Sequence, residues 1–272
     1  MSYKTILVHA DHSRHAPSRI AAACALALGA EAHLVGLATH GLSRFADPAF
    51  ARTLYAPQLL ASGQHAGAAL DAFERGAAAA GVPSSERRLV EDEPASALAL
   101  HARYADLVVL SQSDPDDPVA RSAIGLPEYV LLAGARPALV VPYAGRFERL
   151  GQNVLAAWDG GLAASRALSA ALPLLRRAGR VTLALFNPHD AEGRQPGADI
   201  ALWLARHGVR VELSEQPDGL DAGQAMLSLA AGLNSDLLVM GCYGHARLRE
   251  LVLGGATETI LRNMTVPVLM SH

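Results

Sequence analysis

The sequence predicts two α/β domains of similar size, each with a doubly wound, five-stranded and mostly parallel sheet. Two observations support this prediction. Short apolar runs bounded by Gly, Pro or Asp alternate with Ala- and Leu-rich helical stretches along the chain. The same order of segments then occurs twice. A chain of 272 residues is long enough for two domains that each bury a hydrophobic core.

The repeat is clearest around the fourth strand of each half. The segment YADLVVLSQSD at 104–114 matches NSDLLVMGCYG at 234–244. RPALVVPY at 136–143 and TVPVLMSH at 265–272 form a looser second match. Because both matches have nearly the same separation along the chain, they indicate duplication of one unit.

Both halves also begin in the same way. TILVHADHS places Asp11 directly after the first predicted strand, and NVLAAWDGG does the same with Asp159. The polar segment AGRFERLGQ follows the first unit and is typical of a linker. We therefore predict domains at 1–143 and 153–272.

Each predicted domain contains five apolar runs of strand length, with helices between them. In the first domain the predicted strands are 4–9, 32–38, 87–91, 106–111 and 138–142. In the second domain they are 153–157, 180–186, 209–214, 236–240 and 266–270, with a shortened second helix at 198–207. Pro137 and Pro267 each open a last strand, where a missing N–H is tolerated.

Composition and charge exclude several classes of partner. The chain carries 23 Lys and Arg against 26 Asp and Glu, so a net charge of -3 favours neither nucleic acid nor an anionic membrane. The longest uninterrupted apolar stretch, Ile20 to Leu28, is shorter than the roughly 20 residues of a membrane span. The start lacks the apolar region of a signal peptide, and two cysteines without paired spacing indicate a reducing compartment. We therefore predict a cytoplasmic protein with no nucleic-acid or membrane partner.

The fold predicts where a ligand would bind. Doubly wound domains bind ligands outside the carboxyl ends of their strands, at the switch point beside the first strand. In the second domain Asp159 follows the first strand and Gly241 follows the fourth. Gly241 and Gly244 would permit positive φ and a close approach of backbone N–H groups to phosphate oxygens. The alternative is that such glycines serve only to let a strand and a helix pack.

A second part of this loop also favours an anion. Gly254 and Gly255 precede a helix predicted to begin near Ala256, whose free N–H groups and dipole attract negative charge. His245 and Arg247 add basic side chains nearby. The loop therefore has the features of a phosphate site.

The spacing Gly241-x-x-Gly244, nine residues, Gly254, then a helix and VPVL resembles the nucleotide loop of the universal stress protein family. The whole chain is similar to tandem, two-domain members. The resemblance implies Rossmann-like (flavodoxin-like) domains and ATP or AMP held by this loop, with Mg²⁺ as a candidate companion. It also implies that Asp159 lies near the ribose or adenine, and that the two domains pair as an intramolecular pseudo-dimer; a homodimer is a further candidate assembly.

One position departs from the family pattern. The family has Ser or Thr directly after the third glycine, where this chain has Gly255. Thr257 could supply another hydroxyl, although it is equally an ordinary residue of a first helical turn. We expect the missing hydroxyl to weaken phosphate binding by about tenfold. The adenine is expected near the end of the second strand, around Phe186 and Asn187.

The first domain has lost the glycines. Ser111, Asp114 and Ile124 stand at the three glycine positions, with Asp116 and Asp117 between them. Because these carboxylates would repel a triphosphate, we predict no ATP site there. The aspartate after the first strand is retained, which on its own is typical of a residue that begins a helix.

Other candidates are weaker. His9, His12 and His15 could ligate zinc if they converged, but separate packing and surface roles are the better interpretation, so no metal site is predicted. Cys242 is a candidate redox thiol or simply a buried residue. No catalytic motif is present, and no catalytic residue is predicted. The predicted function is a stress protein whose second domain binds ATP or AMP as a regulatory ligand; the alternatives are a slow metal-dependent ATPase and a nucleotide-free scaffold.

Overall fold

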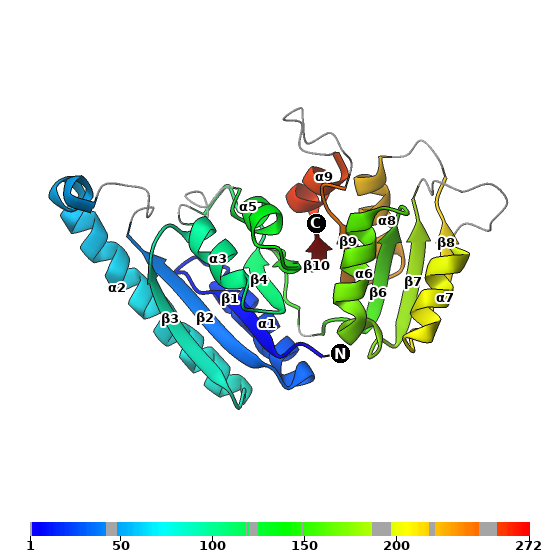
Figure 1. Ribbon diagram of the computed structural model, residues 1–272, viewed down its shortest axis with the longest axis horizontal. Coiled ribbons are helices and arrows are strands. Elements are labelled where there is room, and N and C mark those ends of the chain that lie inside the picture. The colour runs from blue at the N-terminus through cyan, green and yellow to red at the C-terminus, as the bar shows by residue number, and fades with distance from the viewer. Residues whose placement is uncertain are drawn as a thin grey trace. The chain divides into compact units, whose positions relative to one another are not determined.

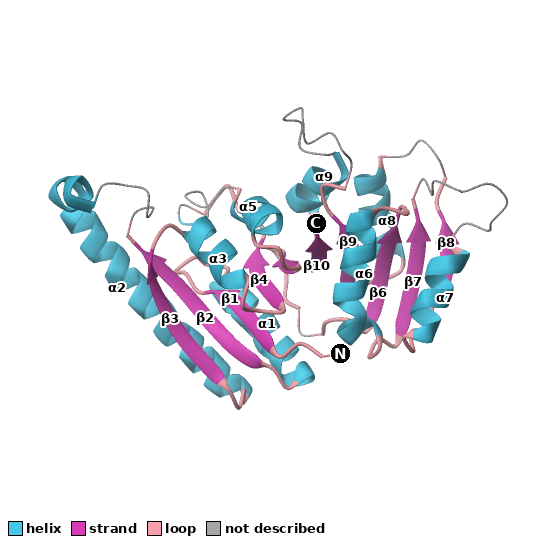
Figure 2. Cartoon of the chain, viewed as in Figure 1, coloured by secondary structure: helices cyan, strands magenta, loops and turns pink. Residues whose placement is uncertain are grey.

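The protein is described by a computed structural model (Figures 1 and 2). It describes residues 2–41, 48–117, 119, 125–147, 149–186, 197–217, 221–244 and 255–272. The chain divides into two compact units, Ser2–Tyr143 and Ala144–His272.

The first unit has five parallel strands in the order β3-β2-β1-β4-β5. Its elements are β1 (Thr5–His9), α1 (Ala16–Ala30), β2 (His33–His40), α2 (Pro48–Ala80), β3 (Ser85–Glu91), α3 (Pro94–Ala102), β4 (Leu107–Ser111), α5 (Leu126–Ala133) and β5 (Ala138–Val141). Helices α1 and α2 contact each other, as do α3 and α5, so the sheet lies between two helical layers. The winding changes direction between β1 and β4, as the sequence predicts.

The second unit repeats this arrangement, with the strand order β10-β9-β6-β7-β8 and parallel pairing throughout. Its elements are β6 (Asn153–Trp158), α6 (Leu162–Leu175), β7 (Arg180–Leu185), α7 (Ala198–Arg206), β8 (Glu212–Glu215), α8 (Ala222–Gly232), β9 (Leu237–Gly241), α9 (Gly255–Asn263) and β10 (Val268–Ser271). The predicted fold class is thus confirmed in both halves. The central strands are buried on both faces, which explains their continuous apolar runs.

The aspartate that repeats between the halves joins two strands at their amino ends. Asp106 accepts hydrogen bonds from the backbone N–H groups of Lys4 and Thr5, at 2.7 and 2.9 Å. Asp236 accepts three such bonds, from the N–H groups of residues 151–153. A carboxylate in this place satisfies backbone donors at the start of the first strand of each unit. The aspartate in the clearest sequence repeat therefore has a structural role in both halves.

Most strand boundaries differ from the prediction by one or two residues, and the largest difference is in the second domain. The third strand of the second domain was expected over 209–214, whereas β8 covers Glu212–Glu215. The N–H of Val209 donates to the carbonyl of Leu204 at 3.0 Å, so Val209 belongs to the turn that ends α7. An apolar residue after a helix often packs against the last turn, and this accounts for the shift.

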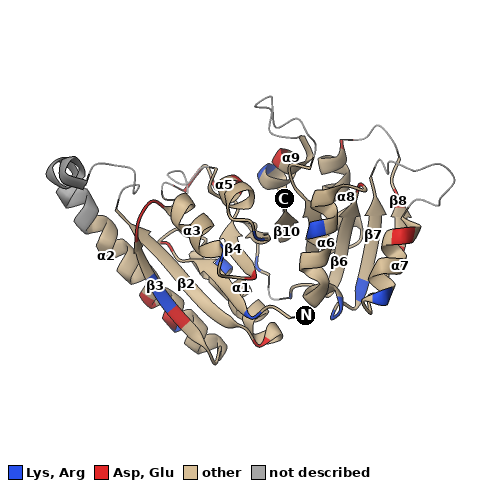
Figure 3. Cartoon of the chain, in the orientation of Figure 1, with Lys and Arg blue, Asp and Glu red and all other residues tan. Residues whose placement is uncertain are grey.

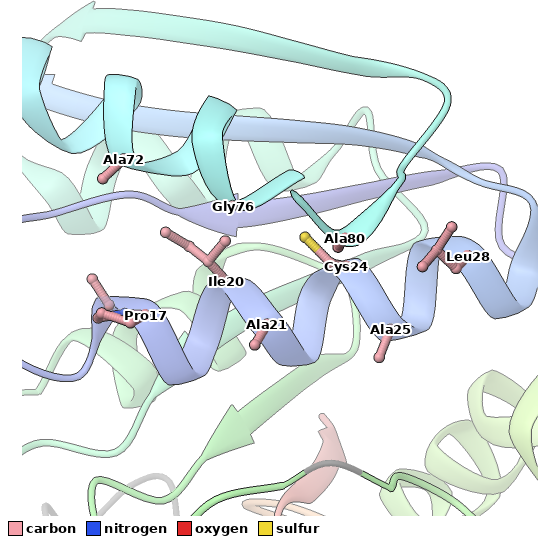
Figure 4. Close-up of a pocket in the computed structure, with 10 residues that line it drawn as sticks. Pro17, Ile20, Ala21, Cys24, Ala25, Leu28, Ala72, Gly76 and Ala80 are labelled. Carbon is pink, nitrogen blue, oxygen red and sulfur yellow. The ribbon is translucent and has the colours of Figure 1, made fainter. Parts of the chain in front are cut away.

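An apolar hollow of about 340 Å³ lies between α1 and α2 (Figure 4). Small side chains, among them Ala21, Ala25 and Gly76, create the space, and Cys24 lies in its wall. Burial raises the pKa of the Cys24 thiol to about 11. The hollow offers no charged group for a phosphate, so it is not the predicted ligand site. None of the helices in the described ranges has the length and hydropathy of a membrane span.

Candidate functional site

The carboxyl ends of β6 and β9 meet the first turn of α6 in the second unit. The two strands are neighbours, with Ala156 opposite Val239. Gly241 lies so close to α6 that a Cβ there would be 2.5 Å from the backbone nitrogen of Ala164. A Cβ at Gly244 would lie 3.4 Å from the Cβ of Ala163. The glycine loop and the residues after β6 therefore lie together, as predicted from the topology.

Positive φ, one of the two properties expected of these glycines, is absent from both. Neither Gly241 nor Gly244 has positive φ; Tyr243 adopts the left-handed conformation instead, with φ of 54°. At Gly241 the need for glycine comes from the backbone of α6, which leaves no room for a side chain. The packing interpretation therefore accounts for Gly241.

Asp159 has one carboxylate oxygen in use and one available. Its Oδ1 accepts a hydrogen bond from the N–H of Gly161 at 2.8 Å, directly before α6. Its Oδ2 has no hydrogen-bond partner among the residues that the structure describes, and the side chain is only partly buried. This oxygen can accept a hydrogen bond from a ligand at the ends of β6 and β9.

Helix α9 begins at Gly255, close to the same loop. The N–H of Tyr243 donates to Oγ1 of Thr257 at 3.3 Å, and the Thr257 side chain is buried. Thr257 thus supports the loop, a role that sequence reasoning did not predict. Among the described residues, no atom would lie within 4 Å of a Cβ at Gly255, so they leave the space above it open. Ala256 follows in the first turn of the helix.

Of the other predicted site residues, the structure describes Phe186. Phe186 follows β7, its N–H donates to the carbonyl of Trp158, and its side chain is buried. Asn187, His245, Arg247 and Gly254 lie outside the described residues. Two of these, His245 and Arg247, are the basic side chains of the predicted phosphate loop.

In the first unit the equivalent crevice is filled by Arg19. This residue lies eight positions after Asp11, as Ala167 lies eight positions after Asp159, and it is 1% exposed. Its guanidinium donates to the carbonyl of His9, to the hydroxyl of Ser111 and to Oδ1 of Asp11, each at 2.7 Å. These bonds join the carboxyl ends of β1 and β4.

The ion pair of Arg19 fixes the charge of Asp11. Burial alone would raise the pKa of this carboxyl, but the charges of Arg19 and His9 and the hydrogen bond from Ser13 hold it well below its usual range. Asp11 is thus ionised and already bonded within the protein. Its counterpart Asp159 has no arginine at the equivalent position.

The acidic loop after β4 is turned toward α1. Asp114 is 2% exposed and accepts hydrogen bonds from Arg14 and from Nε2 of His15, the latter at 2.6 Å. Burial opposes ionisation, yet these bonds and the backbone N–H of Asp116 lower the pKa of Asp114 to about 2. Asp117 accepts from the N–H of Arg14. With these bonds the loop closes the crevice with its own side chains. This closure is a stronger obstacle to a triphosphate than the charge repulsion expected from the sequence.

The three histidines near this crevice have separate contacts. His9 is buried with its Nδ1 3.6 Å from Asp11, His15 bonds to Asp114, and the ring of His12 lies against His65 with centroids 4.5 Å apart. Among the described residues, no group of three metal-ligating side chains occurs. Cys242 is also buried, and burial raises the pKa of its thiol to about 12.

The environment of His9 predicts that acid destabilises the first unit. Burial lowers the pKa of His9 to about 4, below the usual 6.5. The unfolded chain therefore binds a proton at a higher pH than the folded chain, so stability is complete above pH 6.5 and falls toward pH 4. We expect a loss of about 3 kcal/mol over this range. Urea unfolding at several pH values should show the slope in wild type and a flatter one in His9→Gln, with the exposed His12→Gln as control; equal slopes in all three would contradict the prediction.

Comparison with known proteins agrees with a doubly wound α/β protein. Residues 151–272 match the model of the universal stress protein family. A universal stress protein of Synechocystis sp. is 29% identical in an alignment of 174 residues that covers 60% of this chain and 57% of that protein. The match thus spans less than two thirds of that relative. The match over residues 151–272 agrees with the resemblance to this family that the sequence shows.

The fold similarity extends to both halves. The structure of a universal stress protein from Archaeoglobus fulgidus aligns with a TM-score of 0.70 at 16% identity, covering 98% of this chain and 95% of that one. A functionally unknown protein from Pseudomonas aeruginosa aligns with a TM-score of 0.58 at 17% identity, covering 99% and 92% of the two chains. At these identities the comparison shows the fold alone.

Proposed function

We propose that the second domain binds an adenine nucleotide, ATP or AMP, as a regulatory ligand at the ends of β6 and β9. The observation that carries the proposal is the contrast between the two crevices. Asp11 is paired with Arg19, whereas Asp159 keeps an acceptor oxygen with no partner among the described residues. Ligands of doubly wound domains bind at this position.

The parts of the nucleotide would be held by different groups. The free oxygen of Asp159 would accept a hydrogen bond from a ribose hydroxyl or the adenine amino group. The N–H groups at the start of α9, next to the open space above Gly255, would donate to a phosphate. Thr257 would keep the loop in place through the N–H of Tyr243. These residues bind and orient, and none is proposed to act in catalysis. Pairing of the domains as a pseudo-dimer and a cytoplasmic location stay predictions.

Native mass spectrometry and calorimetry test this function directly. We expect one ATP or AMP per chain, and binding at least about tenfold weaker in Asp159→Ala, because one hydrogen bond to a carboxylate is removed. Protein that carries no nucleotide and gives no heat with ATP or AMP would favour the scaffold alternative. Magnesium-dependent release of ADP that Asp159→Ala abolishes would favour the slow ATPase.

The missing hydroxyl provides a second prediction. Gly255→Ser places an Oγ at the start of α9, in a space where the new Cβ meets no atom within 4 Å. We expect ATP to bind about tenfold more tightly, because the hydroxyl can donate to a phosphate oxygen. Gly255→Ala is the control for the change in backbone freedom. If Ser and Ala at this position give the same affinity, the phosphate does not lie at the start of α9.

A further inference from the structure

Five arginines lie at the amino ends of β7 and β8 in the second unit. Figure 3 shows basic residues there, at the lower ends of β7 and α7. They follow α6, begin β7, end α7 and precede β8. The members of this arginine cluster, all exposed, are Arg176, Arg177, Arg180, Arg206 and Arg210. This edge holds the amino ends of β7 and β8, whereas the proposed nucleotide site lies at the carboxyl ends of β6 and β9.

A hydrogen bond and an ion pair connect the segments that carry the cluster. Nε of Arg176 donates to the carbonyl of His207 at 2.7 Å, which connects the end of α6 to the end of α7. Arg180 forms an ion pair with Glu212, the first residue of β8, with 2.5 Å between Nη2 and Oε2. Arg210 lies two residues before Glu212, and adjacent strands are about 4.8 Å apart. The guanidinium groups therefore share one small surface.

Positive charge exceeds negative charge on this surface. Glu212 is paired with Arg180, and neither Arg206 nor Arg210 forms an ion pair with any residue in the described ranges. A basic residue in the last turn of a helix interacts favourably with the helix dipole, and this accounts for Arg206. It does not account for Arg180 and Arg210 at the starts of strands.

The first unit shows that the fold does not require the cluster. The corresponding segments there are GAEAH at 29–33, between α1 and β2, and AAGVP at 79–83, between α2 and β3. Neither contains an arginine or a lysine. The two units share the same strand order, so the arginines are a property of the second unit alone.

We propose that the arginine cluster binds a compact, soluble oligophosphate anion. The planar guanidinium group donates two parallel hydrogen bonds to phosphate oxygens, and several such groups on one surface suit an anion with several charges. An extended acidic peptide or nucleic-acid strand fits less well, because Glu212 and Glu215 lie along the adjacent edge strand and would repel it. The site is separate from the proposed nucleotide site and does not depend on it.

Calorimetry with inorganic tripolyphosphate at low ionic strength tests the proposal. We expect binding that weakens as salt is added, since exposed charges are screened. The triple variant Arg176→Gln, Arg180→Gln, Arg206→Gln should bind at least about tenfold more weakly, because three charged donors are removed. Circular dichroism should show that this variant keeps the wild-type fold.

A matched control removes the same charge from the first unit, through Arg87→Gln, Arg88→Gln and Arg103→Gln. This control should bind tripolyphosphate as wild type does, and so should Gly244→Val, which changes the proposed nucleotide loop. Absence of tripolyphosphate binding, or equal weakening in both triple variants, would overturn the proposal. So would loss of the site in Gly244→Val, or binding only to phosphatidylglycerol vesicles.

Discussion

Arg19→Ala is expected to destabilise the first domain by about 3 to 5 kcal/mol, the cost of leaving one partner of a buried ion pair alone. Arg19 is 1% exposed, and its guanidinium is bonded to Asp11, Ser111 and the carbonyl of His9. The substitution leaves the Asp11 carboxylate without its cation and opens a void beside α1, at the carboxyl ends of β1 and β4. Alanine occurs naturally at the equivalent Ala167, but there the neighbouring Asp159 forms no ion pair with any residue that the structure describes.

The two tryptophans make this effect measurable in the full chain. Trp158 and Trp203 are both in the second domain, so their fluorescence reports its unfolding, whereas far-ultraviolet circular dichroism reports both domains. In Arg19→Ala the circular dichroism should show a transition at lower urea while the fluorescence midpoint stays unchanged.

A double variant tests whether charge is the cause. In Arg19→Met, Asp11→Asn both charges are replaced, and part of the stability should return, since a buried pair is often no more stable than neutral groups of similar volume. Arg14→Ala, which removes an arginine with an exposed side chain from the same helix region, should shift the transition much less. An unchanged circular dichroism transition in Arg19→Ala would show that the buried ion pair does not stabilise the domain.

The sequence was sufficient for the fold because several local signals agree. Alternating apolar strands and Ala-rich helices, repeated once, define a doubly wound sheet, and the chain offers no competing pattern. Asp106 and Asp236 repeat because each binds backbone N–H groups at the start of a first strand. The error at β8 arose because the apolar Val209 belongs to the end of α7 and not to the edge strand.

The site was predicted less completely. The meeting of Asp159 and Gly241 follows from topology, which sequence order determines. The filling of the first crevice depends on where one long side chain points, and no strand or helix pattern contains that information. A signal was nevertheless present: Arg19 interrupts an apolar helix, and a buried arginine requires an anion such as Asp11 nearby. The conformation of Tyr243 had no such signal, because positive φ at a tyrosine depends on tertiary contacts.

Gly241→Ala is expected to destabilise the second domain by about 3 kcal/mol. The new Cβ would lie 2.5 Å from the nitrogen of Ala164 and 2.6 Å from the carbonyl carbon of Ala163. Both atoms belong to the backbone of α6, so no rotation of a side chain can relieve the overlap. Either β9 or the start of α6 must move, and tryptophan fluorescence should show unfolding at lower urea.

Two other glycines of the same region are the controls. Gly255→Ala adds a Cβ where no atom lies within 4 Å, and Gly244→Ala adds one at 3.4 Å from the Cβ of Ala163, an ordinary contact. The order of destabilisation should therefore be Gly241, then Gly244, then Gly255. If all three variants unfold at the same urea concentration, close packing against α6 is not the reason for glycine at 241. Because Gly255→Ala keeps the fold in this series, its nucleotide affinity can be compared with that of Gly255→Ser without a correction for stability.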